Sequence, residues 1–142
     1  KDQPRVPITA KLIAQLIAIR EFAKDIHYTV HGLTMYGNHI FADFIHDEID
    51  NFIDDIKEDC LLGMGLRPLP SKEYLQKAIS ILPEPLLNDD KDNFMSMLGI
   101  IDNTLDLINK MDNLSKGEEN LVGAIAQRLQ KVKGLINLSL EV

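Results

Sequence analysis

The sequence contains few of the residues that build covalent or thiolate-based frameworks. Its 142 residues include one cysteine, Cys60, and no tryptophan. A single cysteine excludes an internal disulfide bond and a cysteine-rich zinc site. We therefore expect Cys60 to be a small buried core residue rather than a redox centre.

Two kinds of hydrophobic segment are also absent. No uncharged apolar run approaches the roughly 18 residues that mark a membrane-spanning helix. No basic start followed by an apolar stretch marks a secretion signal. These absences favour a cytoplasmic protein with no membrane partner. The sequence begins at Lys1 without an initiator Met, so we expect a processed or trimmed N-terminus.

Basic residues are fewer than acidic residues in this sequence. Lys and Arg number 15 against 22 Asp and Glu, so the formal net charge is −7. An acidic protein repels phosphate backbones, and affinity for nucleic acid would have to come from a local basic segment. Hydrophobic residues make up 45% and charged residues 26% of the chain. At this length, that composition is typical of one globular domain over residues 1–142.

Proline is confined to the edges of the long periodic segments. Between these edges, apolar residues recur at steps of three and four, as they do in helices. The pattern predicts long helices over residues 7–31, 38–62, 89–114 and 116–140, a short helix over residues 71–79, and an N-terminal extension of residues 1–7. This order predicts an all-α four-helix bundle, with the short helix in the crossover between the second and third long helices.

Four potential metal ligands share one face of the predicted second helix. With His39 at zero on a helical wheel, Asp43 lies near 40°, Asp54 near 60° and Glu58 near 100°, at about 100° per residue. The apolar stripe of this helix lies between about 200° and 320°, so the ligands are displaced from the core. His39 and Asp43 form one i,i+4 pair, and Asp54 and Glu58 form another.

These two pairs cannot hold the same ion within one chain. Asp43 and Asp54 are separated by roughly 16 Å along a helix, whereas metal–oxygen bonds are about 2 Å long. Two copies of the helix packed antiparallel would join the His/Asp pair of one copy to the Asp/Glu pair of the other, and a two-fold dimer would contain this site twice. His27 would add a second imidazole, and such nitrogen and oxygen ligands suit iron, manganese or zinc. Taken alone, such an acidic run is more often a solvated helix face.

The full ligand spacing resembles a known family. The pattern His27–x₁₁–His39–x₃–Asp43–x₁₀–Asp54–x₃–Glu58 is similar to the ferroxidase signature of the Dps family, the mini-ferritins named as DNA-binding proteins from starved cells. Gly32, the glycine–proline break over residues 63–68 and the short-helix stretch over residues 71–75 also resemble that family. The resemblance implies a ferritin-like fold and a hollow dodecamer assembled from two-fold dimers.

The resemblance also implies an activity. Family members oxidise Fe(II), preferably with hydrogen peroxide, and store Fe(III) mineral inside the cage, which suppresses hydroxyl-radical formation and protects DNA. Iron would then be bound and oxidised between subunits, with His27, His39 and Asp43 from one subunit and Asp54 and Glu58 from its mate. Glu58 is our candidate for a carboxylate that bridges two irons.

Four residues near these ligands are candidates for supporting roles. Tyr28 stands where the family commonly has Trp, and we expect a packed aromatic rather than an electron donor. His31 either orients His27 from one turn away or is an exposed histidine. Asp47 and Asp50 form either an acidic relay or a solvated surface. We assign no role to His46.

Two further functions depend on charged residues outside this motif. Acidic residues around the start of the fourth helix line three-fold pores in that family, and the candidates here are Asp112, Glu118 and Glu119; N-capping explains both glutamates equally well. DNA binding in the family usually depends on basic tails. Lys1, Arg5 and Lys11 are the only basic residues near the N-terminus, so we expect weak or no DNA binding, and nucleoid association only if DNA is bound.

Three hypotheses therefore stand. The first is an iron-oxidising storage cage. The second is a DNA-compaction protein with a vestigial metal site, and the third is a helical scaffold whose acidic stripe is only solvated.

Overall fold

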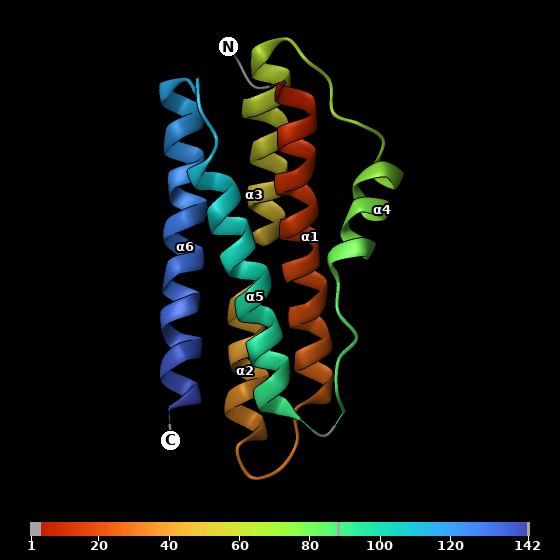
Figure 1. Cartoon of the computed structure of the whole chain (residues 1–142), viewed down its shortest axis with the longest axis vertical. Coiled ribbons are helices and arrows are strands. Elements are labelled where there is room, and N and C mark those ends of the chain that lie inside the picture. The colour runs from red at the N-terminus through yellow and green to blue at the C-terminus, as the bar shows by residue number, and fades with distance from the viewer. Residues whose placement is uncertain (1–3, 88, 142) are drawn as a thin grey trace.

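The computed structural model describes residues 4–87 and 89–141, and these form helices and no strand. The elements are α1 (Arg5–Thr29), α2 (Met35–His46), α3 (Ile49–Asp55), the π-helix η1 (Ile56–Leu61), the 3₁₀-helix η2 (Leu62–Met64), α4 (Ser71–Ile81), α5 (Asp90–Asn109) and α6 (Lys116–Leu140). The long helices run alongside one another, with α2 and α3 in succession along one rod, and α4 lies beside α1 outside the bundle (Figure 1). The predicted all-α bundle with a short crossover helix is confirmed. None of the described helices combines the length and apolar character that crossing a membrane requires.

Several predicted helix boundaries are wrong by a few residues. α1 begins at Arg5, inside the predicted extension, because Pro7 lies in the first helical turn, where an N–H would have no helical acceptor. α2 begins at Met35 rather than after Asn38, and α5 ends at Asn109, before residue 114. The range of α6 agrees with the prediction, and α4 ends at Ile81, two residues later than predicted.

The predicted continuous helix over residues 38–62 is wrong. Asp47 leaves the helical region with a ψ of 141°, and Glu48 has a left-handed φ of 73° before α3 begins. From Ile56 the backbone widens into the π-helix η1. Ile45 and Ile49 are buried on either side of the break and are four residues apart, as in an unbroken helix. The hydrophobic period therefore gives no sign of the break.

α1 is the central helix of the core. Its buried side chains face several directions and include Leu12, Ile13, Leu16 and Phe22, because α2, α4 and α5 all pack against it. A helix that is apolar around most of its circumference belongs in the interior. Cys60 is fully buried, as predicted, and burial raises the pKa of its thiol to about 11.

A buried ion pair ties the start of α1 to the start of α6. Arg5 donates from Nε and Nη2 to the two carboxylate oxygens of Glu118 at 2.7 and 2.8 Å. Glu118 also accepts from the backbone N–H of Ser115, whose hydroxyl accepts from the Glu118 N–H, so the two residues form a capping box. The side chains of Arg5 and Glu118 are only 11% and 1% exposed. Within the single chain Glu118 is therefore buried against Arg5 rather than exposed as a pore residue, and the N-capping alternative is confirmed for Glu118. DNA binding through Arg5 stays a prediction.

Loss of the Glu118 charge should destabilise the fold. In Glu118→Gln the guanidinium of Arg5 stays buried without its carboxylate, and we expect about 2–4 kcal/mol less free energy of unfolding at pH 7. Burial raises the pKa of Glu118, but the hydrogen bonds and charge of Arg5 outweigh it, so this pKa lies below its ordinary value of 4.5. Such a carboxylate contributes stability that is fully present above pH 4.5 and is lost as the pH falls through its folded-state pKa.

Guanidinium unfolding of wild type and Glu118→Gln measures both effects. The difference in free energy of unfolding between the two proteins should be largest at pH 7 and smaller near pH 3. Lys133→Gln is the control, because it breaks an exposed 2.7 Å pair with Asp102 between α5 and α6 and should cost less than about 1 kcal/mol. An equal loss of unfolding free energy in the two variants would contradict the expectation that the buried ion pair contributes more stability than the exposed one.

Relief of the strained residue at the break should stabilise the protein. Glu48→Gly should add about 0.5–1 kcal/mol to the free energy of unfolding, because glycine adopts a positive φ without a steric penalty from Cβ. Asp47→Gly is the matched control: its φ of −59° suits any residue, so glycine there should only lower stability. Thermal unfolding compares the two, and a loss of stability in both would show that the Glu48 backbone is not strained.

Candidate metal centre

Two histidines join the end of α1 to the start of α2. The five-residue connection over residues 30–34 includes Gly32 at a φ of 83°, a conformation that glycine adopts without strain. This tight return places His27 in the last turn of α1 beside His39 in α2. Nδ1 of His27 lies 3.0 Å from the carbonyl oxygen of His39, and Nδ1 of His39 lies 2.8 Å from the carbonyl oxygen of His27.

This reciprocal pairing determines which ring nitrogens are available to a metal. A carbonyl oxygen only accepts hydrogen bonds, so each Nδ1 carries the hydrogen and donates it. The lone pair of a neutral ring is then on Nε2. A hydrogen bond from one ring nitrogen to a carbonyl is the usual way in which a metal-binding histidine is oriented. The two rings also stack, with centroids 3.5 Å apart and planes inclined by 26°.

Asp43 completes this first group of side chains. Its Oδ1 lies 3.1 Å from Nδ1 of His27 and 3.2 Å from Nε2 of His46. His46 lacked an assigned role in the sequence interpretation, although its i,i+3 spacing from Asp43 is the signal that places the two on one helix face. His46 therefore orients the Asp43 carboxylate from one turn further along α2.

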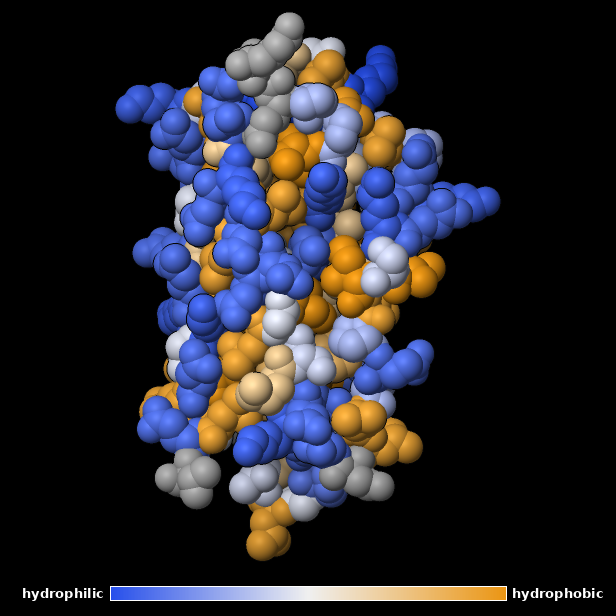
Figure 2. Space-filling view, in the orientation of Figure 1, coloured by the Kyte–Doolittle hydropathy of each residue, from blue (hydrophilic) through white to orange (hydrophobic). Residues whose placement is uncertain are grey.

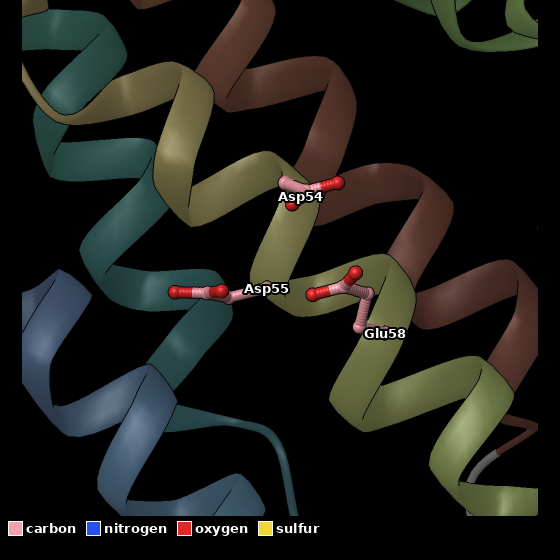
Figure 3. Close-up of side chains that lie close together, drawn as sticks. All are labelled: Asp54, Asp55 and Glu58. Carbon is pink, nitrogen blue, oxygen red and sulfur yellow. The ribbon is translucent and has the colours of Figure 1, made fainter.

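A second group of side chains lies on α3 and η1. Asp54, Asp55 and Glu58 each place one carboxylate oxygen within 4.8 Å of the others (Figure 3). The i,i+4 spacing predicted the pair of Asp54 and Glu58, whereas Asp55, the i,i+3 neighbour of Glu58, was not among the predicted ligands. In the part of the chain that the structure describes, this is the only group of three His, Cys, Asp or Glu side chains gathered in this way.

The two groups are separate within the chain. The first belongs to the α1–α2 hairpin and the second to α3 and η1, on the other side of the break at Asp47 and Glu48. The structure therefore brings His27, His39 and Asp43 together, and it brings Asp54 and Glu58 together, but it does not combine the two groups. Their role as iron ligands stays a prediction.

Two neighbours of His27 differ from expectation. Tyr28 meets the His27 ring edge-on at 4.8 Å, but within the single chain it is 82% exposed rather than buried. His31 turns away from His27: its Nδ1 lies 3.1 Å from a carboxylate oxygen of Asp90 at the start of α5. The alternative in which His31 orients His27 is wrong, and the exposed-histidine alternative is confirmed.

Two arginines bond residues on either side of the break, one at a backbone carbonyl and the other at a side-chain carboxylate. Arg128 of α6 donates to the carbonyl oxygen of Phe44 at 2.8 Å, and its guanidinium lies 4.0 Å above the Phe44 ring. In a continuous helix this carbonyl would accept from the N–H of residue 48, so Arg128 replaces a bond that the break removes. Arg20 of α1 bonds Asp50 at 2.8 Å just after the break. Asp50 is thus an ion-pair partner rather than a free member of an acidic relay, and Asp47, at the break itself, is exposed.

The remaining pore candidates lie at the connection between α5 and α6. Asp112 and Glu119 line a surface cavity of about 400 Å³ there, together with apolar residues such as Met111 and Val122. With Glu118 buried, the predicted pore depends on Asp112 and Glu119 alone.

The fold matches known structures over almost its whole length. A C-terminal deletion mutant of Mycobacterium smegmatis Dps aligns with a TM-score of 0.80 at 16% identity, covering 96% of this chain and 97% of that chain. A Vibrio cholerae O1 Dps, described as a member of a broad superfamily of ferritin-like diiron-carboxylate proteins, aligns with a TM-score of 0.68 at 19% identity, covering 96% and 89%. Dps from Listeria monocytogenes aligns with a TM-score of 0.66 at 18% identity, covering 98% and 90%.

No family model matches the sequence, and no curated protein matches it. The likeness therefore lies in the three-dimensional arrangement of the helices. The ferritin-like fold of Dps proteins, which the ligand spacing implied, is confirmed.

Removal of the Arg128 contact should loosen the end of α2. In Arg128→Gln we expect amide hydrogen exchange over residues 45–49 to be about tenfold faster, because a hydrogen bond from a charged donor to the Phe44 carbonyl is lost. Lys133→Gln, on the same helix but paired with Asp102 of α5, is the control and should leave this segment unchanged. Unaltered exchange in Arg128→Gln would show that the break holds its geometry without the arginine.

Proposed function

We propose that this chain is a Dps-family subunit that oxidises Fe(II), with hydrogen peroxide as the oxidant, and stores the Fe(III) product in a hollow dodecamer. The iron sites lie between subunits, and removal of Fe(II) and peroxide together protects DNA from oxidative damage. The Dps-like fold and the two separate ligand groups support this proposal.

The observation that carries the proposal is the reciprocal hydrogen bonding of His27 and His39. Both rings leave Nε2 unused within one helix hairpin, and the carboxylate of Asp43 lies at the other ring nitrogen, Nδ1, of His27. Such a pair of oriented imidazoles is an incomplete coordination shell for iron, which commonly takes further carboxylate ligands. The chain carries such carboxylates elsewhere, in Asp54 and Glu58.

An antiparallel two-fold partner completes each shell. The Nε2 atoms of His27 and His39 and the Asp43 carboxylate then meet the partner subunit's Asp54 and the partner subunit's Glu58, and the symmetry repeats the site at the other end of the interface. Asp55 adds a third carboxylate beside Asp54 and Glu58. Within one chain neither group is sufficient, and this makes assembly a condition of activity.

Exposed apolar side chains near the carboxylate group support this assembly. Leu62 and Met64 of η2 are 53% and 46% exposed, and Leu75 and Ile79 of α4 are 47% and 70% exposed. Figure 2 shows hydrophobic side chains interrupting the hydrophilic surface over α4. Such a surface is typical of an interface with another subunit.

The oxidation follows from the ligand chemistry. Two Fe(II) ions each lose one electron, the O–O bond of hydrogen peroxide breaks, and two protons convert its oxygens to two waters. Anionic carboxylates favour Fe(III) over Fe(II), because they neutralise the additional charge. Glu58 has two carboxylate oxygens and is the candidate to hold both irons at once.

The DNA-compaction alternative has no support from the described residues. Arg5 is occupied by Glu118, Lys1 lies outside the described residues, and Lys11 alone remains exposed from the predicted basic set. The helical-scaffold alternative does not account for the oriented histidines.

A mixed-subunit experiment tests whether the iron site is shared. His39→Ala and Asp54→Ala should each slow Fe(II) oxidation by roughly tenfold or more, because each removes one ligand. When the two variants assemble together at random, half of the dimers are mixed, and each mixed dimer has one intact site. We therefore expect recovery to about a quarter of the wild-type rate.

Stopped-flow absorbance of Fe(III) formation measures these rates in assemblies of confirmed mass. Asp59→Asn, which removes an exposed carboxylate of η1 outside the carboxylate group, is the matched control and should keep the wild-type rate. A mixture no faster than its parents would contradict the shared site, and wild-type rates in both parents would contradict iron oxidation at these residues.

A further inference from the structure

A polar cavity lies between α1, α4 and the end of α5, and neither ligand group contributes a residue to it. It has a volume of about 550 Å³ and is lined by three helices: Lys11 and Gln15 of α1, Lys77 and Ile81 of α4, and Asp106 and Lys110 at the end of α5. α4 packs against α1, and the C-terminal half of α4, with Lys77 and Ile81, lines part of the cavity. This volume lies within the usual range of about 300–1,000 Å³ for small-molecule sites.

The charged side chains among the described residues that line this cavity are mostly basic, whereas the protein as a whole is acidic. Three lysines and one aspartate line it, whereas the chain as a whole has a net charge of −7. The lysines belong to α1, to α4 and to the residue that follows α5, so they are far apart in sequence and converge only in the folded chain. Lys11 and Lys77 form no ion pair among the described residues. Like charges held around one cavity repel each other, and an anion between them removes that repulsion.

The other residues that line the cavity indicate which kind of chemical group is attached to the anion. The amides of Gln15 and Asn103 offer hydrogen-bond donors, and Ala14, Ile81 and Leu107 offer apolar surface. Lysine ammonium groups bind phosphate as point charges. A bare phosphate would satisfy the lysines but leave the apolar surface uncovered, whereas a phosphate ester would use both.

We propose that the cavity between α1, α4 and α5 binds a small phosphate ester, with Lys11, Lys77 and Lys110 around the phosphate group and the organic part against Ala14, Ile81 and Leu107. The site is independent of iron oxidation, because none of its residues belongs to the two ligand groups. Asp106 is the residue that opposes the anion and sets a limit on its affinity.

Calorimetric titration of the metal-free, assembled protein at low ionic strength tests the proposal. The probes are inorganic phosphate, adenosine 5′-monophosphate and adenosine, which lacks the phosphate. We expect the monophosphate to bind more tightly than inorganic phosphate and adenosine not to bind. Affinity for both anions should fall with added salt.

Three variants examine the residues. Lys11→Gln and Lys77→Gln should each weaken binding of inorganic phosphate by about tenfold, because each removes a charged hydrogen-bond donor. Asp106→Asn should strengthen it by several-fold, because it removes the only carboxylate among the described residues that line the cavity. Lys72→Gln removes the same charge from the exposed first turn of α4, outside the cavity, and should change little.

Four outcomes would overturn the proposal. The first is the absence of saturable binding by both anions, and the second is an equal effect of Lys72→Gln and Lys77→Gln, which would indicate a general charge effect. The third is lowered stability in the lysine variants with unchanged affinity, which would mean that the lysines only balance the negative ends of α4 and α5. The fourth is Lys77-dependent binding of a DNA duplex without binding of the monophosphate, which would assign the phosphate to a nucleic-acid backbone. A wild-type protein that oxidises no iron but binds the monophosphate would leave this inference intact.

Discussion

A metal ion holds its ligands at about 2 Å, and this short distance limits how much of a centre one chain of this protein can supply. His27, His39 and Asp43 belong to one helix hairpin, and Asp54, Asp55 and Glu58 belong to the next section of the same rod. Neither the hairpin nor the carboxylate group can reach the other, because the core packing of α1 against its neighbours keeps both in place. Under the proposed function these two groups are incomplete ligand shells, and a second copy of the chain is needed to complete each of them.

Backbone hydrogen bonds orient the side chains on which this scheme depends. The carbonyls of His27 and His39 each accept from the ring of the other residue. A carbonyl released by the helix break, that of Phe44, accepts from Arg128. The break could have loosened the rod between the two groups, but Arg128 and Arg20 hold its two sides from α6 and α1. The irregular backbone at the break is therefore supported by side chains from helices that are distant in sequence.

Much of the fold follows from sequence because helices follow local rules. The 3.6-residue apolar period and the placement of proline locate α1, α4, α5 and α6 to within a few residues. The ligand pairs His39 and Asp43, and Asp54 and Glu58, follow from the i,i+4 rule alone. The break at Asp47 and Glu48 does not follow, since Ile45 and Ile49 keep the same spacing across it. Arg5 and Glu118 have no local relation at all, and one was therefore expected to face DNA and the other a pore.

The sequence by itself determined where α1, α4, α5 and α6 lie to within a few residues, which residue types could bind iron, and that its two ligand pairs are too far apart for one ion. These conclusions depend only on helical geometry and on the length of a metal–ligand bond. The tertiary structure alone decided which charges are free. Packing brings Arg5 to Glu118, His31 to Asp90 and Arg20 to Asp50, and it gathers three lysines around one cavity. Such pairings form between residues that are distant in sequence, so no local period encodes them.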